Sequence, residues 1–196
     1  MSEHTETPKL SGQFSKALVY AELKHHNQVR KGGDIPYVGH LLSVASLVIN
    51  DGGSEEQAIA ALLHDAVEDQ GGAPTLERIR LRFGDRVAEI VDACTDTDET
   101  PKPPWLERKK RYVAHISDVR EDSLIVSMAD KLYNVRAILA DYRTQGDGVW
   151  DRFKAGKTDV LWYYRALVTA FRKRASGVLL DNLDAAVTEL EDEVRA

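Results

Sequence analysis

The chain has 196 residues, of which 43% are hydrophobic and 30% are charged, and its formal net charge is −6. This length can bury a core without disulfides or other cross-links, so nothing in it requires a second domain. The acidic balance disfavours a nucleic-acid-binding protein, which needs a basic face, but it is compatible with a small phosphorylated substrate held by local cations or a metal ion.

The first quarter of the chain predicts a loose arm and two helices. Residues 1–10 are polar and contain Pro8, which is typical of a flexible N-terminal arm. Apolar residues at helical spacing predict one helix from about Ser11 to Val29 and a second from Tyr37 to Ile49. The glycine-rich segment 32–36 between them favours a break in the chain.

The middle of the chain predicts three further helices and one long loop. Residues 54–57 have the form of a capping box ahead of a third helix, which would carry the acidic run 64–69. Thr75 is expected to cap a helix that ends at Phe83, and Gly84 to introduce the next. Residues 95–104 are polar, acidic and rich in proline, so we expect a loop there that borders a pocket.

The later apolar segments have helical spacing as well. They begin at Trp105 and continue over residues 123–142, 158–174 and 180–196. The sequence shows neither the alternation typical of strands nor a repeat of fixed length. We therefore predict an all-α fold, with one helical domain over residues 11–175 and a C-terminal helical tail over residues 176–196 that packs on the domain or extends it.

Two features bear on the compartment. The single cysteine, Cys94, cannot form an internal disulfide, and no apolar signal segment follows Met1. The longest nearly apolar stretch, Leu41 to Ile49, is too short to cross a bilayer. We expect a cytoplasmic protein without a membrane partner.

One short run concentrates acidic side chains beside a histidine. On a continuous helix His64, Asp65, Glu68 and Asp69 would share a face. Neighbouring carboxylates repel one another, and a cation relieves that cost. A solvated helix end is the alternative, but the apolar residues 60–63 just before the run indicate that it enters the core. This run therefore predicts part of a metal site.

Two other residues can complete the ligand set. His40 lies in the otherwise apolar segment 37–49, and Asp130 ends the mostly apolar run 125–130. Each has another interpretation, because a buried histidine can be satisfied by packing partners and a buried aspartate by an arginine. With His64 and Asp65 they would form a mixed nitrogen and oxygen site, which suits manganese or iron and accepts zinc.

Several segments, in this order along the chain, resemble the motifs of HD hydrolases that degrade the alarmone (p)ppGpp. They are residues 28–32, 36–40, 62–69, 82–87, 106–109 and 128–134. The similarity runs from about Ala17 to Arg143 and is greatest to the small, stand-alone alarmone hydrolases of the Mesh1 and SpoT type. Because the length leaves no room for a synthetase domain, we expect a hydrolase alone.

The resemblance implies a site and a reaction. It implies four manganese ligands, with other divalent metals as alternatives: His40, His64, Asp65 and Asp130. Glu68 and Asp69 would be the catalytic pair, and Glu68 would orient or deprotonate the attacking water. The reaction would remove the 3′-diphosphate of (p)ppGpp as pyrophosphate and return GDP or GTP.

Five residues are candidates for substrate binding. Arg30 would stack on the base and Lys31 would attract phosphate, although both could be an exposed basic helix end. Asn134, one turn after Asp130, would contact the nucleotide or else pack between helices. Lys157 is a further phosphate candidate, and Tyr163 would wall the pocket or lie in the core.

The sequence departs from the family pattern at three positions. Leu41 and Gln70 stand where proline and threonine are common, and Ala137 stands where many long members have threonine. Hydrolysis of an adenosine alarmone or of NADPH, and a non-catalytic alarmone sensor, are the alternative functions. Base preference, homo-oligomer formation and movement of the 95–104 loop over substrate are left open by the sequence.

Overall fold

The computed structural model describes residues 10–97, 99 and 101–195, and within them every regular element is a helix apart from one isolated bridge between Val29 and Pro36. In chain order the elements are α1 (Gly12–His25), α2 (Val38–Asn50), α3 (Glu55–Leu63), α4 (Ala66–Asp69), α5 (Gly72–Phe83), α6 (Asp85–Cys94), α7 (Trp105–His115), the 3-10 turn η1 (Glu121–Ser123), α8 (Leu124–Gln145), the 3-10 segment η2 (Gly146–Arg152), α9 (Gly156–Arg172) and α10 (Val178–Arg195). The predicted all-α fold is confirmed. Residues 1–9 of the predicted arm lie outside the described residues.

Helix α3 is the centre of the N-terminal half. Residues 58–63 are all buried, and a helix that is apolar on every side belongs inside a core. The predicted capping box starts it, because the Ser54 hydroxyl accepts from the Gln57 amide while the Gln57 side chain accepts from the Ser54 amide. Gly53 makes the preceding turn tight, since a Cβ there would lie 2.6 Å from a Val48 methyl group.

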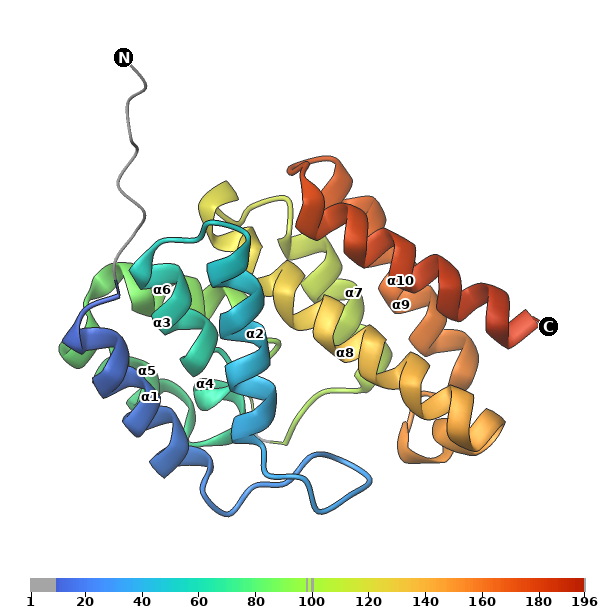
Figure 1. Ribbon diagram of the computed structural model, residues 1–196, viewed down its shortest axis with the longest axis horizontal. Helices are drawn as coiled ribbons and strands as arrows, with labels where there is room; N and C mark the ends of the chain where they lie inside the picture. Colours follow the sequence, from blue (N-terminus) through green and yellow to red (C-terminus); the bar gives the residue numbers. More distant parts are fainter. Residues whose placement is uncertain (1–9, 98, 100, 196) are drawn as a thin grey trace.

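The other helices pack around this centre. Helices α1, α2 and α6 contact α3, and α5 packs on α6 (Figure 1). The long helix α8 lies against both α2 and α3, so it joins the N-terminal group to the C-terminal helices. This arrangement brings the end of α3, the start of α2 and the first half of α8 to one place.

Helix α10 covers the far end of α8 and α9 (Figure 1). Its buried face includes Leu180, Leu183 and Leu190. Its acidic face is held by arginines of the helices beneath, as in the bonds from Arg165 Nη1 to Asp184 at 2.7 Å and from Arg165 Nη2 to Glu191 at 2.8 Å. The segment predicted as the last helix is therefore amphipathic and packed.

Three predicted boundaries were wrong. The first helix ends at His25 and not near Val29, because the Gln28 amide bonds to the His25 carbonyl and turns the chain. Thr75 does not cap α5, which begins at Gly72; its hydroxyl instead donates to the Gln70 carbonyl. The helix predicted to carry residues 64–69 is broken at His64 and Asp65.

In the described part of the chain no helix is both long and apolar enough to span a membrane.

Candidate metal centre and active site

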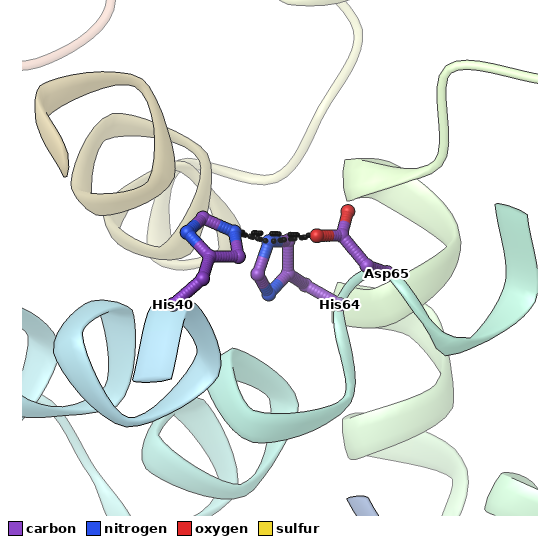
Figure 2. Close-up of side chains that lie close together, drawn as sticks. All are labelled: His40, His64 and Asp65. Atoms are coloured by element: carbon purple, nitrogen blue, oxygen red, sulfur yellow. Dashed lines mark hydrogen bonds and ion pairs between the residues drawn. The ribbon is translucent and has the colours of Figure 1, made fainter. Parts of the chain in front are cut away.

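Three segments bring the predicted ligands together. His40 lies in the first turn of α2, His64 and Asp65 form the junction between α3 and α4, and Asp130 lies in α8. Figure 2 shows the side chains of His40, His64 and Asp65 pointing toward one another. Both histidines are almost fully buried, and Asp130 is 6% exposed.

The break between α3 and α4 corrects the expectation of a single continuous helix. The Nδ1 of the His64 ring lies 2.8 Å from the carbonyl oxygen of Ala61, so the ring itself satisfies a carbonyl in the last turn of α3. Asp65 then starts the short helix α4, and its carbonyl accepts from the Asp69 amide. The junction separates the predicted ligands His64 and Asp65 from Glu68 and Asp69 by one turn.

The four ligand atoms lie within 3.5 Å of one another in nearly every pairing. His40 Nε2 is 3.2 Å from His64 Nε2, 3.2 Å from Asp65 Oδ2 and 3.3 Å from Asp130 Oδ1. His64 Nε2 is 3.0 Å from the same oxygen of Asp65 and 3.5 Å from that of Asp130. Ligands about 2.0–2.2 Å from one metal ion are separated by about this much.

The tautomer of His64 shows why these atoms need a cation. The Ala61 carbonyl only accepts, so Nδ1 of His64 carries the proton and Nε2 of the neutral ring carries a lone pair. That lone pair faces the oxygens of Asp65 and Asp130, which are acceptors too. An arrangement of facing lone pairs is repulsive unless a proton or a metal ion lies among them. The residues present therefore fit a divalent metal, and the nitrogen and oxygen donors suit manganese, iron or zinc.

In the absence of a metal ion, a second proton on the His64 ring takes that place among the lone pairs, and the pKa values of these groups reflect it. Burial lowers the pKa of His64, but Asp65 and Asp130 outweigh burial and hold it well above its usual value. Burial raises the pKa of Asp65, yet the two histidines hold it well below its usual value. Burial also raises the pKa of Asp130, but Lys131 and then the two histidines outweigh burial and hold this pKa well below its usual value. Both ligand carboxylates are thus ionised.

Two residues fix the ligand carboxylates and were not predicted as site residues. The Tyr37 hydroxyl donates to Asp65 Oδ2 at 2.5 Å. Lys131 Nζ binds Asp130 Oδ2 at 2.5 Å, which leaves Oδ1 for the ligand cluster. Both residues lie inside segments that resemble family motifs, so this resemblance is the feature of the sequence that could have identified them. Such partners orient the groups that hold a metal.

Glu68 and Asp69 lie in α4, one helical turn after Asp65. Glu68 Oε1 accepts from Lys102 Nζ at 2.8 Å, and a hollow of about 400 Å³ lies between this pair and the turn at residues 71–74. Asp69 Oδ2 accepts from Gln28 Nε2 at 2.8 Å. The pKa of Asp69 is raised to about 6, first by the protein atoms packed around its carboxyl group and then by the charge of Asp65, although the residue as a whole is exposed to solvent.

Two predicted substrate residues are connected to Asp130, one of the predicted metal ligands. Asn134 Nδ2 donates to Asp130 Oδ1 at 2.5 Å, and its Oδ1 accepts from Arg30 at 3.3 and 3.4 Å. The Arg30 guanidinium also lies over the Tyr133 ring at 5.1 Å. Arg30 follows the Val29 bridge and not a helix, so its place is set by a hairpin-like loop.

The remaining predicted substrate residues make contacts with residues outside the predicted ligand set. Lys31 is exposed, with Nζ 5.5 Å from the Phe153 ring, and burial and then Lys154 lower its pKa. Lys157 pairs with Asp147 at 2.9 Å. Tyr163 is buried, and no hydroxyl partner is found for it among the described residues. Their substrate contacts stay predictions.

Comparisons with known proteins identify the family. A family model described as HD domain matches residues 17–161. The MESH1 guanosine-3′,5′-bis(diphosphate) 3′-pyrophosphohydrolase of Xenopus tropicalis is 40% identical over 124 residues, which are 62% of this chain and 66% of that protein. The MESH1 protein of Homo sapiens is 36% identical over 129 residues, 64% of this chain and 69% of that one.

A solved structure, described as a metazoan orthologue of SpoT that hydrolyses ppGpp, has the same fold. It superposes with a TM-score of 0.72 at 24% sequence identity, over 94% of this chain and 97% of the other. With the family match over most of the chain and the convergence of His40, His64 and Asp65, the chain belongs to the HD domain family and, within it, to the group that contains the MESH1 proteins.

Proposed function

We propose that this protein is a metal-dependent hydrolase that removes the 3′-diphosphate of (p)ppGpp, releasing pyrophosphate and GDP or GTP. The observation that carries the proposal is the convergence of two imidazole nitrogens and two carboxylate oxygens, with two further carboxylates one turn away. The MESH1 relatives bear the name of this activity. Their matched regions span about two thirds of their own lengths, 66% and 69%.

Manganese is the metal that we propose for the site, with His40, His64, Asp65 and Asp130 as its ligands. A divalent ion held there would polarise a phosphoryl oxygen and lower the pKa of a water molecule. Lys131 and Asn134 hold the two oxygens of Asp130 in different directions, so one oxygen faces the histidines. This positioning favours a ligand that binds through a single oxygen.

Glu68 and Asp69 are the residues that we propose for proton transfer. Glu68 is anchored by Lys102 and Asp69 by Gln28, so both carboxylates are held at the edge of the site. Glu68 would orient the attacking water and accept its proton, and Asp69 would assist. The raised pKa of Asp69, about 6, lies near neutral pH, where a carboxyl group can both take up and release a proton.

Arg30 and Asn134 are the residues that we propose to contact the nucleotide. The planar guanidinium of Arg30 already lies over the Tyr133 ring, and a purine ring could stack on its other face. Burial, and then the nearby charges of Lys154 and Arg152, lower the pKa of Lys31. These three cations lie close together and would attract a phosphate chain. Lys157 and Tyr163 are weaker candidates because of their own partners and burial.

One assay tests the proposal. The protein is incubated with ppGpp and manganese, and the products are separated by chromatography; GDP and pyrophosphate are expected. A parallel panel contains pppGpp, ppApp and NADPH. Preferred turnover of ppApp or NADPH would mean that the substrate is a different nucleotide. Tight ppGpp binding without turnover would favour a sensor. Absence of turnover with manganese, iron, zinc and magnesium would refute a hydrolase.

A further inference from the structure

Helices α1 and α5 border a groove at one side of the molecule (Figure 1). Its volume is about 590 Å³, which lies within the range of small-molecule sites. Its wall includes the rings of Tyr20 and Phe83, which meet edge to face with their centroids 5.7 Å apart. None of the residues that line this groove is a predicted metal ligand or substrate residue. The groove is therefore a second concave site, which the proposed function does not use.

Two aliphatic side chains of α1 leave part of the groove apolar and uncovered. Val19 is 58% exposed and Leu23 is 61% exposed, and they lie one helical turn apart on the same face. Single exposed apolar side chains are ordinary on a protein surface, but here they adjoin two aromatic rings in one hollow. A ligand that fits this groove must have an apolar part.

Four cations form a cluster at the groove, which we call the α1–α5 cation cluster: Lys16, Lys24, Arg78 and Arg82. Cζ of Arg82 lies 5.1 Å from the centroid of the Tyr20 ring, and Nζ of Lys24 lies 5.8 Å from it. Burial lowers the pKa of Lys24, and the nearby charges of Arg78 and Arg82 lower it further. Like charges at this separation repel one another, and an anion relieves that repulsion.

No carboxylate of the described residues forms an ion pair with the α1–α5 cation cluster. Arg80, in the same helix, pairs with Asp85 at 3.0 Å. In contrast, Lys24 donates to the neutral carbonyl of Gln70 at 3.3 Å, and Arg78 to that of Pro74 at 3.2 Å. The formal net charge of the chain is −6, so this concentration of unmatched positive charge is local. An anionic group of a ligand would complement it.

We propose that the groove between α1 and α5 binds a small aromatic anion, which is a planar ring that carries a phosphate or a carboxylate group. Arg82 is an exposed residue with one face of its guanidinium toward Tyr20, so the other face can stack on a planar ring. Lys16 would attract the anionic group, and Val19 and Leu23 would cover the edge of the ring. The site does not depend on the proposed function.

The charge of the groove argues against a second copy of the chain as its occupant. In a two-fold dimer the same face of each copy meets the other, so two α1–α5 cation clusters would be brought together. Repulsion between them opposes such a contact. A small anion meets no such cost, and it also satisfies the apolar wall if it carries a ring.

Calorimetric titration of the manganese-loaded full chain with 1-anilinonaphthalene-8-sulfonate, an aromatic sulfonate, tests the proposal. Binding at one site is expected. Arg82→Gln and Lys16→Gln should each weaken binding about tenfold, because each removes a cation that faces the ligand. Both residues are exposed, so the fold should tolerate these changes. Lys110→Gln removes an exposed cation of α7 and should leave binding unchanged.

Arg30→Ala separates this groove from the proposed nucleotide site. The variant should bind the sulfonate as the wild type does. If Arg30→Ala weakens binding and Arg82→Gln does not, the sulfonate occupies the nucleotide site, and the proposal is overturned. Failure of the wild type to bind the sulfonate would also overturn it, whether or not any nucleotide is hydrolysed.

Displacement of the sulfonate from the Arg30→Ala protein identifies the anionic group. AMP represents aromatic phosphates, 2-naphthoate represents aromatic carboxylates, and octanoate is an aliphatic anion. Displacement by AMP or by 2-naphthoate alone would support the proposal and show which group is preferred. Equal displacement by octanoate would refute the requirement for a ring. If sedimentation shows a dimer that Leu23→Asp dissociates, the groove is a contact between copies, and the proposal is overturned.

Discussion

Replacement of Asp69 by asparagine is expected to stabilise the metal-free protein at neutral pH while it removes most activity. The pKa of Asp69 is raised from an ordinary value of 3.8 to about 6. The native state therefore binds the proton of Asp69 more tightly than the unfolded chain does, and ionisation of Asp69 costs stability. Asparagine cannot ionise, and its oxygen can still accept from Gln28 Nε2.

The size of the effect follows from the same values. The difference between 3.8 and about 6 corresponds to roughly 3 kcal/mol for a carboxyl group shielded from water. Because part of the Asp69 side chain is exposed, solvent screening reduces this figure, and we expect about 1–2 kcal/mol at pH 7.5. The cost of ionisation is absent below about pH 4, grows as the pH rises from 4 to 6, and is constant above about pH 6. The advantage of the variant should follow that course.

Urea denaturation in the presence of a chelator measures the prediction. The free energy of unfolding is compared between wild type and Asp69→Asn at pH 7.5, 5.5 and 4. Asp92→Asn, an exposed position on α6, is the control and should change stability by less than about 0.5 kcal/mol. If Asp69→Asn is no more stable than the wild type at pH 7.5, or if its advantage is the same at all three pH values, the assignment of Asp69 as a crowded, destabilising carboxylate is wrong.

Three further predictions concern the ligands, the nucleotide site and the fold. Asp130→Ala should abolish divalent-metal binding in calorimetry, whereas Glu68→Gln should keep it and lose at least about a hundredfold in kcat; equal metal loss in both would contradict their separate roles. Arg30→Ala should raise KM for ppGpp about tenfold and change kcat less, and the reverse pattern would argue against ground-state nucleotide binding. Ser54→Ala should lower the free energy of unfolding by about 1 kcal/mol through loss of the α3 cap, and unaltered stability would show that the cap is dispensable.

The helices could be predicted because their apolar residues follow the helical period. The second predicted helix, from Tyr37 to Ile49, is α2 at Val38–Asn50, because its buried residues include Leu41, Val44 and Val48 at the spacing of a single face. The predicted helix boundaries are wrong where a side chain, and not the next turn of the helix, forms a hydrogen bond with a backbone group. The ring of His64 occupies the Ala61 carbonyl, and the period of apolar residues carries no information about such a bond.

Residue type and apolar context are enough to propose the metal ligands, but they do not identify the residues that support them. Lys102 meets Glu68 across 34 positions and Tyr37 meets Asp65 across 28. Neither pair lies on one helix, so no helical spacing relates its members. The folded chain brings Tyr37 and Lys102 to the junction between α3 and α4, and the local sequence does not specify this approach.

The position of the hydrogen-bond donors, and not the number of acids, distinguishes the candidate metal centre from an ordinary acidic surface. On α10 the carboxylates of Asp184 and Glu191 end on the guanidinium of Arg165, so their charge is already matched. In the centre, Lys131 holds only the outer oxygen of Asp130, and the inner oxygen faces two histidine nitrogens, one of which carries a lone pair. Buried lone pairs that face one another would not persist in a stable core without a proton or a metal ion among them. The same burial that makes this cluster costly in the metal-free protein therefore favours the binding of a metal ion.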